Sequence, residues 1–192
     1  MTMQQTLLTE IPPTYATWDP AFLGAHMVLS GGNLKASGGS TGTFQEMTRS
    51  TISKTSGKWY WEITLNTDGG YSFGMGICNS SEVTSNYTGG SANSWAYDCS
   101  AGVANKVHTG TAVAYGTLFV QGDVIGVALD MTGGTLIYYR NGVSQGTAYS
   151  SGITGTMYAA VTPWNTSLCT ANFGASPFVY TVPSGYNAGL FK

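Results

Sequence analysis

The chain has 192 residues, enough for one domain with a sizeable hydrophobic core. Only 8% of the residues are charged and the net charge is −2, whereas there are 27 glycines and the aromatic content is 12%. These proportions favour many short strands joined by glycine-containing turns over amphipathic helices. The seven basic residues form no run, and phosphate neutralisation requires a concentrated basic surface, so no nucleic-acid partner is predicted.

Residues 1–17 are predicted to form an extended N-terminal arm and residues 18–192 a single domain, because Pro12 and Pro13 disfavour helix and sheet. The arm is either a disordered tail or a segment that docks on another subunit through Leu7, Leu8 and Ile11. The first ten residues lack the charge and the apolar run of a secretory signal. No stretch is long and apolar enough to span a bilayer, so we expect no membrane insertion.

The first strands of the domain are predicted from short apolar runs between glycine, serine and asparagine. A hairpin is expected at residues 27–36, a strand at residues 47–52 and a longer strand at residues 58–65. Alternation along the longer strand puts four apolar side chains on one face: Trp59, Trp61, Ile63 and Leu65. That face is expected to line the core, and the opposite face, which carries Glu62, to be partly wet.

The next segments alternate between strands and long polar loops. In the strand predicted at residues 71–78, Gly74 and Gly76 would let a bulky aromatic side chain lie against the backbone. Residues 79–93 are predicted to form a long loop, residues 94–99 a strand, and residues 101–115 a second long loop or a weak hairpin.

The strongest signal lies between Gly122 and Gly146, where apolar runs are separated by a glycine turn and by Asn141-Gly142. This pattern predicts a three-stranded meander at the centre of an all-β domain. Two further strands are expected at residues 157–164 and 168–173, followed by a proline-containing segment strapped across an edge. With no helix longer than a turn or two and ten to thirteen strands, the prediction is a two-layer antiparallel β-sandwich.

Five segments resemble, in order and spacing, the successive strand motifs of the SPRY domain family. They are Gly57–Ile63 (GKWYWEI), Gly122–Asp130 (GDVIGVALD), Ile137–Val143 (IYYRNGV), Met157–Val161 (MYAAV) and Asn172–Phe178 (NFGASPF). The resemblance covers about residues 18–185 and implies a bent, concanavalin-like sandwich. It also implies a non-catalytic protein that binds its partners through variable loops at one rim.

Within that family, the chain looks like the forms found in tailed bacteriophages. The likeness rests on three short segments: Trp18-Asp19-Pro20, Leu29–Leu34 and Pro183–Tyr186. It implies a virion protein, such as a capsid decoration or tail-associated protein, that is made in the host cytoplasm. It would be held by the N-terminal arm against other capsid or tail proteins, with several copies associating on the particle.

Catalysis is the less favoured alternative. His26 and His108 stand alone, so neither a nucleophile–base pair nor a metal site is suggested, and no cofactor is expected. A sandwich-fold glycosidase would need two carboxylates on one face, about 5–10 Å apart. Glu62 and Asp98 are the acids to test, because Asp123 and Asp130 are more typical of turn residues.

The three cysteines, Cys78, Cys99 and Cys169, form no CxxC pair and leave an odd one over. They are predicted to be buried small hydrophobes of a chain folded in a reducing cytoplasm, with a disulfide or a reactive thiol as the alternative.

Aromatic and amide side chains in or beside the loops are the candidate ligand-binding residues, since flat rings stack on sugars and anchor protein partners. They are Tyr87, Trp95, Tyr97, Tyr115, Trp164 and Asn165. The function predicted from the sequence is therefore host attachment or particle assembly, through a protein partner or a host-surface polysaccharide. The alternatives are an intracellular peptide-binding adaptor and the glycosidase.

Overall fold

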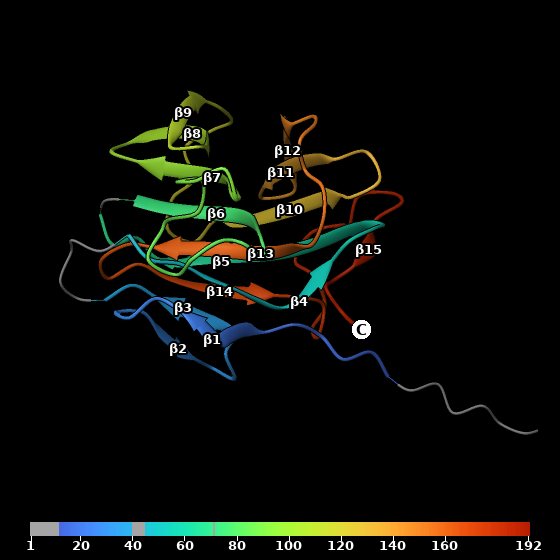
Figure 1. Ribbon diagram of the computed structural model, residues 1–192, viewed down its shortest axis with the longest axis horizontal. Helices are drawn as coiled ribbons and strands as arrows, with labels where there is room; N and C mark the ends of the chain where they lie inside the picture. Colours follow the sequence, from blue (N-terminus) through green and yellow to red (C-terminus); the bar gives the residue numbers. More distant parts are fainter. Residues whose placement is uncertain (1–11, 40–44, 71) are drawn as a thin grey trace, which may run out of the picture.

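The computed structural model describes residues 12–39, 45–70 and 72–192, and these residues form two antiparallel sheets packed as a sandwich (Figure 1). The seven-stranded sheet contains, in spatial order, β1 (Trp18–Leu23), β4 (Thr48–Lys54), β13 (Met157–Pro163), β6 (Ser72–Asn79), β7 (Ser94–Ser100), β8 (Val103–His108) and β9 (Thr111–Ala114). The eight-stranded sheet contains β12 (Val143–Tyr149), β11 (Thr135–Arg140), β10 (Val124–Asp130), β5 (Lys58–Thr67), β14 (Leu168–Asn172), β3 (Lys35–Ser37) and β2 (Val28–Ser30). Its eighth strand, β15 (Asn187–Ala188), runs parallel to the start of β5. The predicted all-β sandwich is confirmed. Residues 101–115, for which the sequence left a long loop or a weak hairpin open, contain the hairpin β8–β9.

The core lies between the two sheets and is filled by alternate side chains of their strands. On β5, Trp61, Ile63 and Leu65 are buried in it, as the period-two pattern predicts. Met75 of β6 packs on them from the other sheet, and Val127 of β10 lies beside Trp61 in the same sheet. Trp59 lies at the end of the same strand face and is only half-buried.

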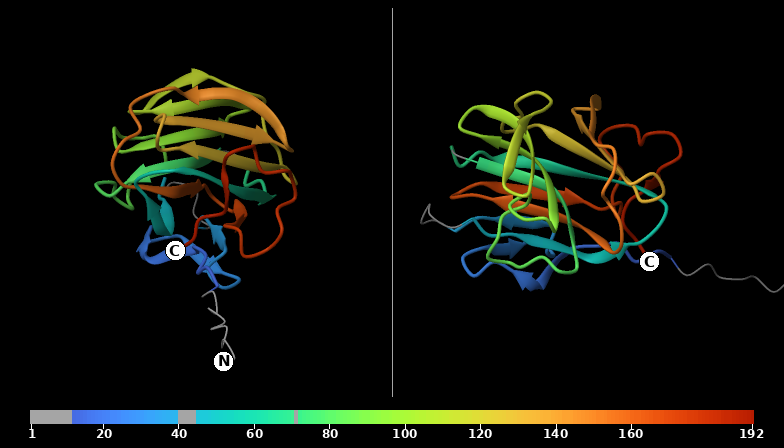
Figure 2. Two further views of the ribbon diagram at one scale, coloured as in Figure 1. Left: turned by 90° about the vertical axis from the view of Figure 1, so that its right-hand side faces the viewer. Right: turned by 45° about the horizontal axis from the view of Figure 1, so that its top comes forward.

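The opposite face of β5 is also buried, which corrects the expectation of a partly wet surface. Tyr60 and Glu62 are each 1% exposed, because the C-terminal segment, residues 173–192, covers them. The Phe178 ring packs edge-on against Tyr60, with 5.2 Å between ring centroids. Figure 2 shows this segment in red, folded back on the sandwich. The predicted strap therefore crosses a sheet face and not a sheet edge.

Glu62 holds this C-terminal strap in place. Its Oε2 accepts a hydrogen bond from the Val179 amide at 2.8 Å, and its Oε1 accepts one from the Tyr180 amide at 2.9 Å. The Tyr60 hydroxyl donates a third to Oε1 at 3.1 Å. A buried carboxylate is tolerated only when it is paired in this way.

The predicted meander is β10–β11–β12, and its turns have the expected chemistry. Asn141 and Gly142 both have positive φ, 49° and 79°, as a two-residue hairpin of the primed type requires. The Asp130 carboxylate accepts hydrogen bonds from the amides of Thr132 and Gly133 in the other turn. The expected central position is only partly right, because β12 forms the edge of its sheet.

Two glycines lie where a side chain would collide with a tyrosine hydroxyl. A Cβ at Gly76 would come within 1.9 Å of the Trp95 carbonyl oxygen and 2.6 Å of the Tyr138 hydroxyl, so the neighbouring strand excludes a side chain there and the expected contact with an aromatic residue is also present. A Cβ at Gly126 would likewise collide with the Tyr60 hydroxyl. The small residues thus make room for the tyrosines on both faces of the eight-stranded sheet.

Contacts with the sandwich start before residue 18, the predicted start of the domain. The Ala16 amide donates to the Leu190 carbonyl at 2.8 Å, and the Lys192 amide donates to the Thr14 carbonyl at 3.0 Å. Tyr15 forms a bridge with Phe191, and Ala16 is buried. Residues 14–17 therefore belong to the sandwich. The proposed docking residues Leu7, Leu8 and Ile11 lie outside the described residues.

Asp123 fixes the entry to the meander and gives a first testable prediction. Burial alone would raise the pKa of Asp123, but hydrogen bonds from Arg140, Val120 and Asn141 outweigh it and hold the pKa below its usual value. We expect Asp123→Asn to lower the free energy of unfolding at neutral pH by about 1.5–3 kcal/mol, the range for hydrogen bonds to a charged group.

The pH dependence follows from the depressed pKa. The stabilisation by the carboxylate is complete above the unfolded-state pKa of about 3.9 and is lost as the pH falls through the lower folded-state pKa. The D123N variant should therefore lose less stability on acidification than the wild type. Urea unfolding from neutral pH to about pH 2 measures both effects, and Asp68→Asn, at an exposed carboxylate, is the control. Parallel pH profiles for the wild type and D123N would contradict the prediction.

Candidate functional site

The loop between β6 and β7, residues 80–93, folds back over the outer face of the seven-stranded sheet. The Thr88 amide donates to the Thr162 hydroxyl at 2.8 Å, and the two threonine hydroxyls are 3.1 Å apart. The Gly89 amide donates to the Ser94 hydroxyl at 2.9 Å. Thr162 lies on the opposite side of β13 from the core residue Val161, so the loop covers the face that points away from the core.

The turn of the β8–β9 hairpin meets this loop. The Thr109 amide donates to the Ser91 carbonyl at 3.1 Å, and the Gly110 amide donates to the Gly89 carbonyl at 2.9 Å. The sequence predicted these two segments as separate loops. The structure places them side by side.

A groove of about 170 Å³, with both polar and apolar lining residues, lies where the loop, the hairpin and β7 come together. Its lining residues are Gln45, Tyr87, Asp98, Ser100, Asn105, Val107, Gly110 and Ala112. The groove combines one tyrosine ring, one carboxylate and several neutral hydrogen-bonding groups. A volume of this size accommodates one or two side chains of a bound polypeptide and is small for a drug-sized ligand.

A buried acid holds the loop that forms one wall of the groove. Glu82 is 5% exposed and accepts hydrogen bonds from the Val83 amide at 3.0 Å, the Asn86 side chain at 3.2 Å and the Ser91 hydroxyl at 2.5 Å. Because the loop is ordered before any ligand arrives, binding at the groove carries a smaller entropic cost.

Of the six predicted ligand-binding residues, only Tyr87 lines the groove. Trp164 and Asn165 are half-buried in the β13–β14 turn, where the side-chain amide of Asn165 donates to the Gly69 carbonyl at 3.1 Å. Sheet register places the end of β13 next to the start of β6 and the end of β7, so Trp164 follows at the groove side of the sheet.

The other three predicted residues are structural. Trp95 is 6% exposed and stacks on His108 at 4.7 Å, while Tyr97 is fully buried and donates to the Thr117 carbonyl. Tyr115 is half-buried and donates to the Gly146 carbonyl at 2.6 Å, which joins the end of β9 to β12. These rings pack inside the sandwich or tie its sheets together, so they offer little surface to a ligand.

The carboxylates proposed for glycoside hydrolysis lie on different sides of the molecule. Glu62 is on the outer face of the eight-stranded sheet, under the strap, and Asp98 is on the outer face of the seven-stranded sheet. Two packed sheets are about 10 Å apart, so these outer faces are separated by more than a glycosidic mechanism allows. Asp123 is paired with Arg140 at 2.7 Å and Asp130 with Lys58 at 3.0 Å. Both acids are buried, so neither is accessible to a sugar substrate.

The two histidines also have structural partners. His26 Nδ1 lies 2.9 Å from Glu46 Oε1, and His108 Nδ1 lies 2.9 Å from the Ser94 carbonyl. Among the described residues there is no group of three or more histidine, cysteine or acidic side chains that could hold a metal ion. The same part of the chain contains no helix long and apolar enough to cross a membrane.

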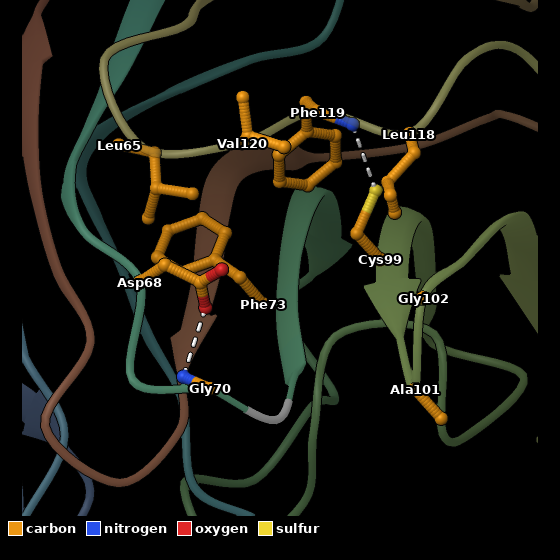
Figure 3. A pocket seen from close by; sticks show the side chains of 10 residues that line it. All are labelled: Leu65, Asp68, Gly70, Phe73, Cys99, Ala101, Gly102, Leu118, Phe119 and Val120. Atoms are coloured by element: carbon orange, nitrogen blue, oxygen red, sulfur yellow. Dashed lines mark hydrogen bonds between the residues drawn. The ribbon is translucent and has the colours of Figure 1, made fainter.

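A second pocket, of about 210 Å³, lies near the end of β7, where Cys99 and Ala101 alternate along the chain with the groove residues Asp98 and Ser100 (Figure 3). Leu65, Phe73 and Val120 form apolar walls, and the Asp68 carboxylate accepts a hydrogen bond from the Gly70 amide at 2.9 Å. Sequence reasoning missed this pocket, because its walls come from three segments that are far apart in the chain: residues 65–73, 99–102 and 118–120. Cys99 lies in it and accepts a hydrogen bond from the Phe119 amide at 3.3 Å.

A protein-family model described as the SPRY domain matches residues 58–176. Ran-binding protein 9 of Xenopus tropicalis is 31% identical over 185 residues, which are 91% of this chain and 33% of that protein. The E3 ubiquitin-protein ligase RKP of Arabidopsis thaliana is 33% identical over 130 residues, which are 66% of this chain and 10% of that protein. The chain thus spans about a third or less of the length of these relatives.

Solved structures show the same fold. The PSpry domain of TRIM65 superposes with a TM-score of 0.68 at 18% identity, covering 83% of this chain and 92% of that one. The SPRY domain of human HERC1 gives a TM-score of 0.66 at 20% identity, covering 80% and 96%.

All three thiols are unpaired, and burial raises the pKa of each to about 12: Cys78, Cys99 and Cys169. Because the thiolate is the reactive form, we expect dithiobis(nitrobenzoate) to label none of them readily in the native protein at about pH 8. Denaturation in urea should expose all three at once. Rapid labelling of one equivalent without urea would instead reveal a reactive cysteine, and replacing Cys99 by serine would show whether it is the one in the pocket.

Proposed function

Because the chain belongs to the SPRY domain family, we propose that it is a protein-binding module without catalytic activity of its own. The observation that carries this proposal is the groove on the outer face of the seven-stranded sheet, where Tyr87, Asp98 and Asn105 meet beside an ordered loop. Tyr87 is half-buried, and a partly accessible aromatic ring next to a few fixed polar groups is typical of the centre of a protein interface. One relative is named for binding Ran and another is named as a ubiquitin ligase, which supports a binding role in a larger assembly.

The composition of the groove favours a polypeptide over a neutral glycan. A sugar ligand would be recognised chiefly by stacking on exposed rings. Of the six residues expected from the sequence, Trp95 and Tyr97 are buried and Tyr115 is engaged with β12, so a continuous stacking platform is missing from the described surface. Asp98 is 9% exposed and accepts a hydrogen bond from the Ser100 hydroxyl, and its remaining acceptor capacity, with the side-chain amide of Asn105, is suited to peptide amides.

The groove can be tested with peptides selected from a display library on the wild-type chain. Tyr87→Ala should weaken the binding of selected peptides at least tenfold, because an aromatic side chain at an interface centre contributes about 2 kcal/mol or more. Val143→Ala is the matched control, since Val143 is 66% exposed on β12 of the other sheet. Titration calorimetry gives both affinities. If Tyr87→Ala binds as tightly as the wild type, the groove is not the binding site.

The finer hypothesis is that the protein is a virion component of a tailed bacteriophage, held on the particle by its N-terminal arm. It rests on the three short segments beginning at Trp18, Leu29 and Pro183. The relatives named above are eukaryotic and lend it no support. A protein-binding groove is compatible with docking on a capsid or tail protein, and with an adaptor role.

Particle composition separates these roles. If the virion hypothesis is right, mass spectrometry of purified particles should detect the protein, and deletion of residues 2–11 should abolish its incorporation without unfolding the domain. The deletion stops before residue 14 because residues 14–17 pair with the C-terminus. Absence of the full-length protein from particles would rule out the virion role, and incorporation of the truncated protein would rule out docking by the arm.

A further inference from the structure

Arg49 on β4 has both flat faces of its guanidinium group covered by aromatic rings. Its Cζ lies 4.0 Å from the centroid of the Phe22 ring and 4.2 Å from the centroid of the Tyr158 ring. Phe22 is on β1 and Tyr158 on β13, the two strands that flank β4 in the seven-stranded sheet. Both rings pack on a small cluster formed by Met47, Cys78 and Ala160.

The hydrogen-bonding capacity of this guanidinium is left unused. Nε and Nη1 of Arg49 are buried, and neither has a hydrogen-bond partner among the described residues. The same part of the chain supplies no ion pair to Arg49. A buried charged donor without a partner is costly, so the arrangement calls for an acceptor.

The nearby acid does not fill this role. Glu82 and Arg49 both act electrostatically on Cys78, but the Glu82 oxygens already accept hydrogen bonds from Val83, Asn86 and Ser91. The other arginine, Arg140, shows the usual solution, with its Nε 2.7 Å from the Asp123 carboxylate. Among the described residues, no such carboxylate faces Arg49.

We propose that Arg49, clamped between Phe22 and Tyr158, is a binding site for the carboxylate of an acidic side chain on a partner protein. Nε and Nη1 are shielded from solvent but the Arg49 side chain as a whole is only partly buried, so a partner carboxylate would approach it through the third nitrogen, Nη2. The rings occupy the two faces of the guanidinium, which leaves its edge to receive a carboxylate in the plane. Aromatic stacking also holds the side chain in one orientation, so that little conformational entropy is lost on binding.

This site is separate from the groove. Met47, which precedes β4, donates its amide to the Thr84 carbonyl at 3.1 Å, so the 80–93 loop reaches the strand that carries Arg49. The same loop forms a groove wall through Tyr87. The proposal does not depend on the groove, and Tyr87→Ala should leave binding at Arg49 unchanged.

The sequence contains two arginines, so the experiment has an internal control. In a nitrogen–proton correlation spectrum of the full chain, the side-chain Nε signals of Arg49 and Arg140 are assigned by R49K and R140K. Sodium acetate and the capped peptide Ac-Gly-Glu-Gly-amide should shift the Arg49 signal saturably and leave the Arg140 signal in place. Acetamide and the matched glutamine peptide should shift neither.

Arg49→Lys should weaken the binding of the glutamate peptide about tenfold, because lysine keeps the charge but lacks the planar group that stacks between the rings. If this variant unfolds, the titrations of the wild-type chain with acetate and the two peptides still test the proposal. Equal shifts with the glutamate and glutamine peptides, or no shift with acetate, would overturn the proposal. A shift with inorganic phosphate alone would also overturn it and indicate a phosphate-bearing ligand instead.

Discussion

The burial of β5 on both faces is the constraint on which the rest of the structure depends. Trp61 and Ile63 point into the core, and Glu62 between them points outward into a second buried layer. A carboxylate in that position must have its oxygens fully paired. The backbone amides of Val179 and Tyr180 meet this requirement, so the C-terminal strap is a necessary part of the fold.

The strap also determines where the protein can bind a partner. It closes the outer face of the eight-stranded sheet over β5, and Tyr180 packs against the Asn141-Gly142 turn of the neighbouring hairpin. Within the described part of the chain, the outer face of the seven-stranded sheet has no comparable cover along its whole width. The loop 80–93 shields its middle and leaves a groove on one side and Arg49 on the other. Recognition is therefore expected on this face.

Sequence patterns that act locally predicted the strands well. The alternation in β5, the glycine turn after Asp130 and the Asn141-Gly142 pair each specify a backbone conformation from adjacent residues. The burial of the aromatic residues was harder to predict, because Trp95 and Tyr97 lie next to long loops. Their period-two spacing with Cys99 was the available signal that all three share the inward face of β7. The partners of Glu62 are 117 and 118 residues away, and no local pattern links them.

The charges on the binding face argue for a particular kind of partner. Asp98 lines the groove and Arg49 lies across the loop from it, so one surface presents groups of opposite sign in a fixed order. A neutral glycan carries no charge to complement either group, which disfavours it. A protein that offers an amide or a basic group to the groove and a carboxylate to Arg49 would satisfy both. In a chain with only 8% charged residues, such a pair discriminates between partners more than it adds to affinity.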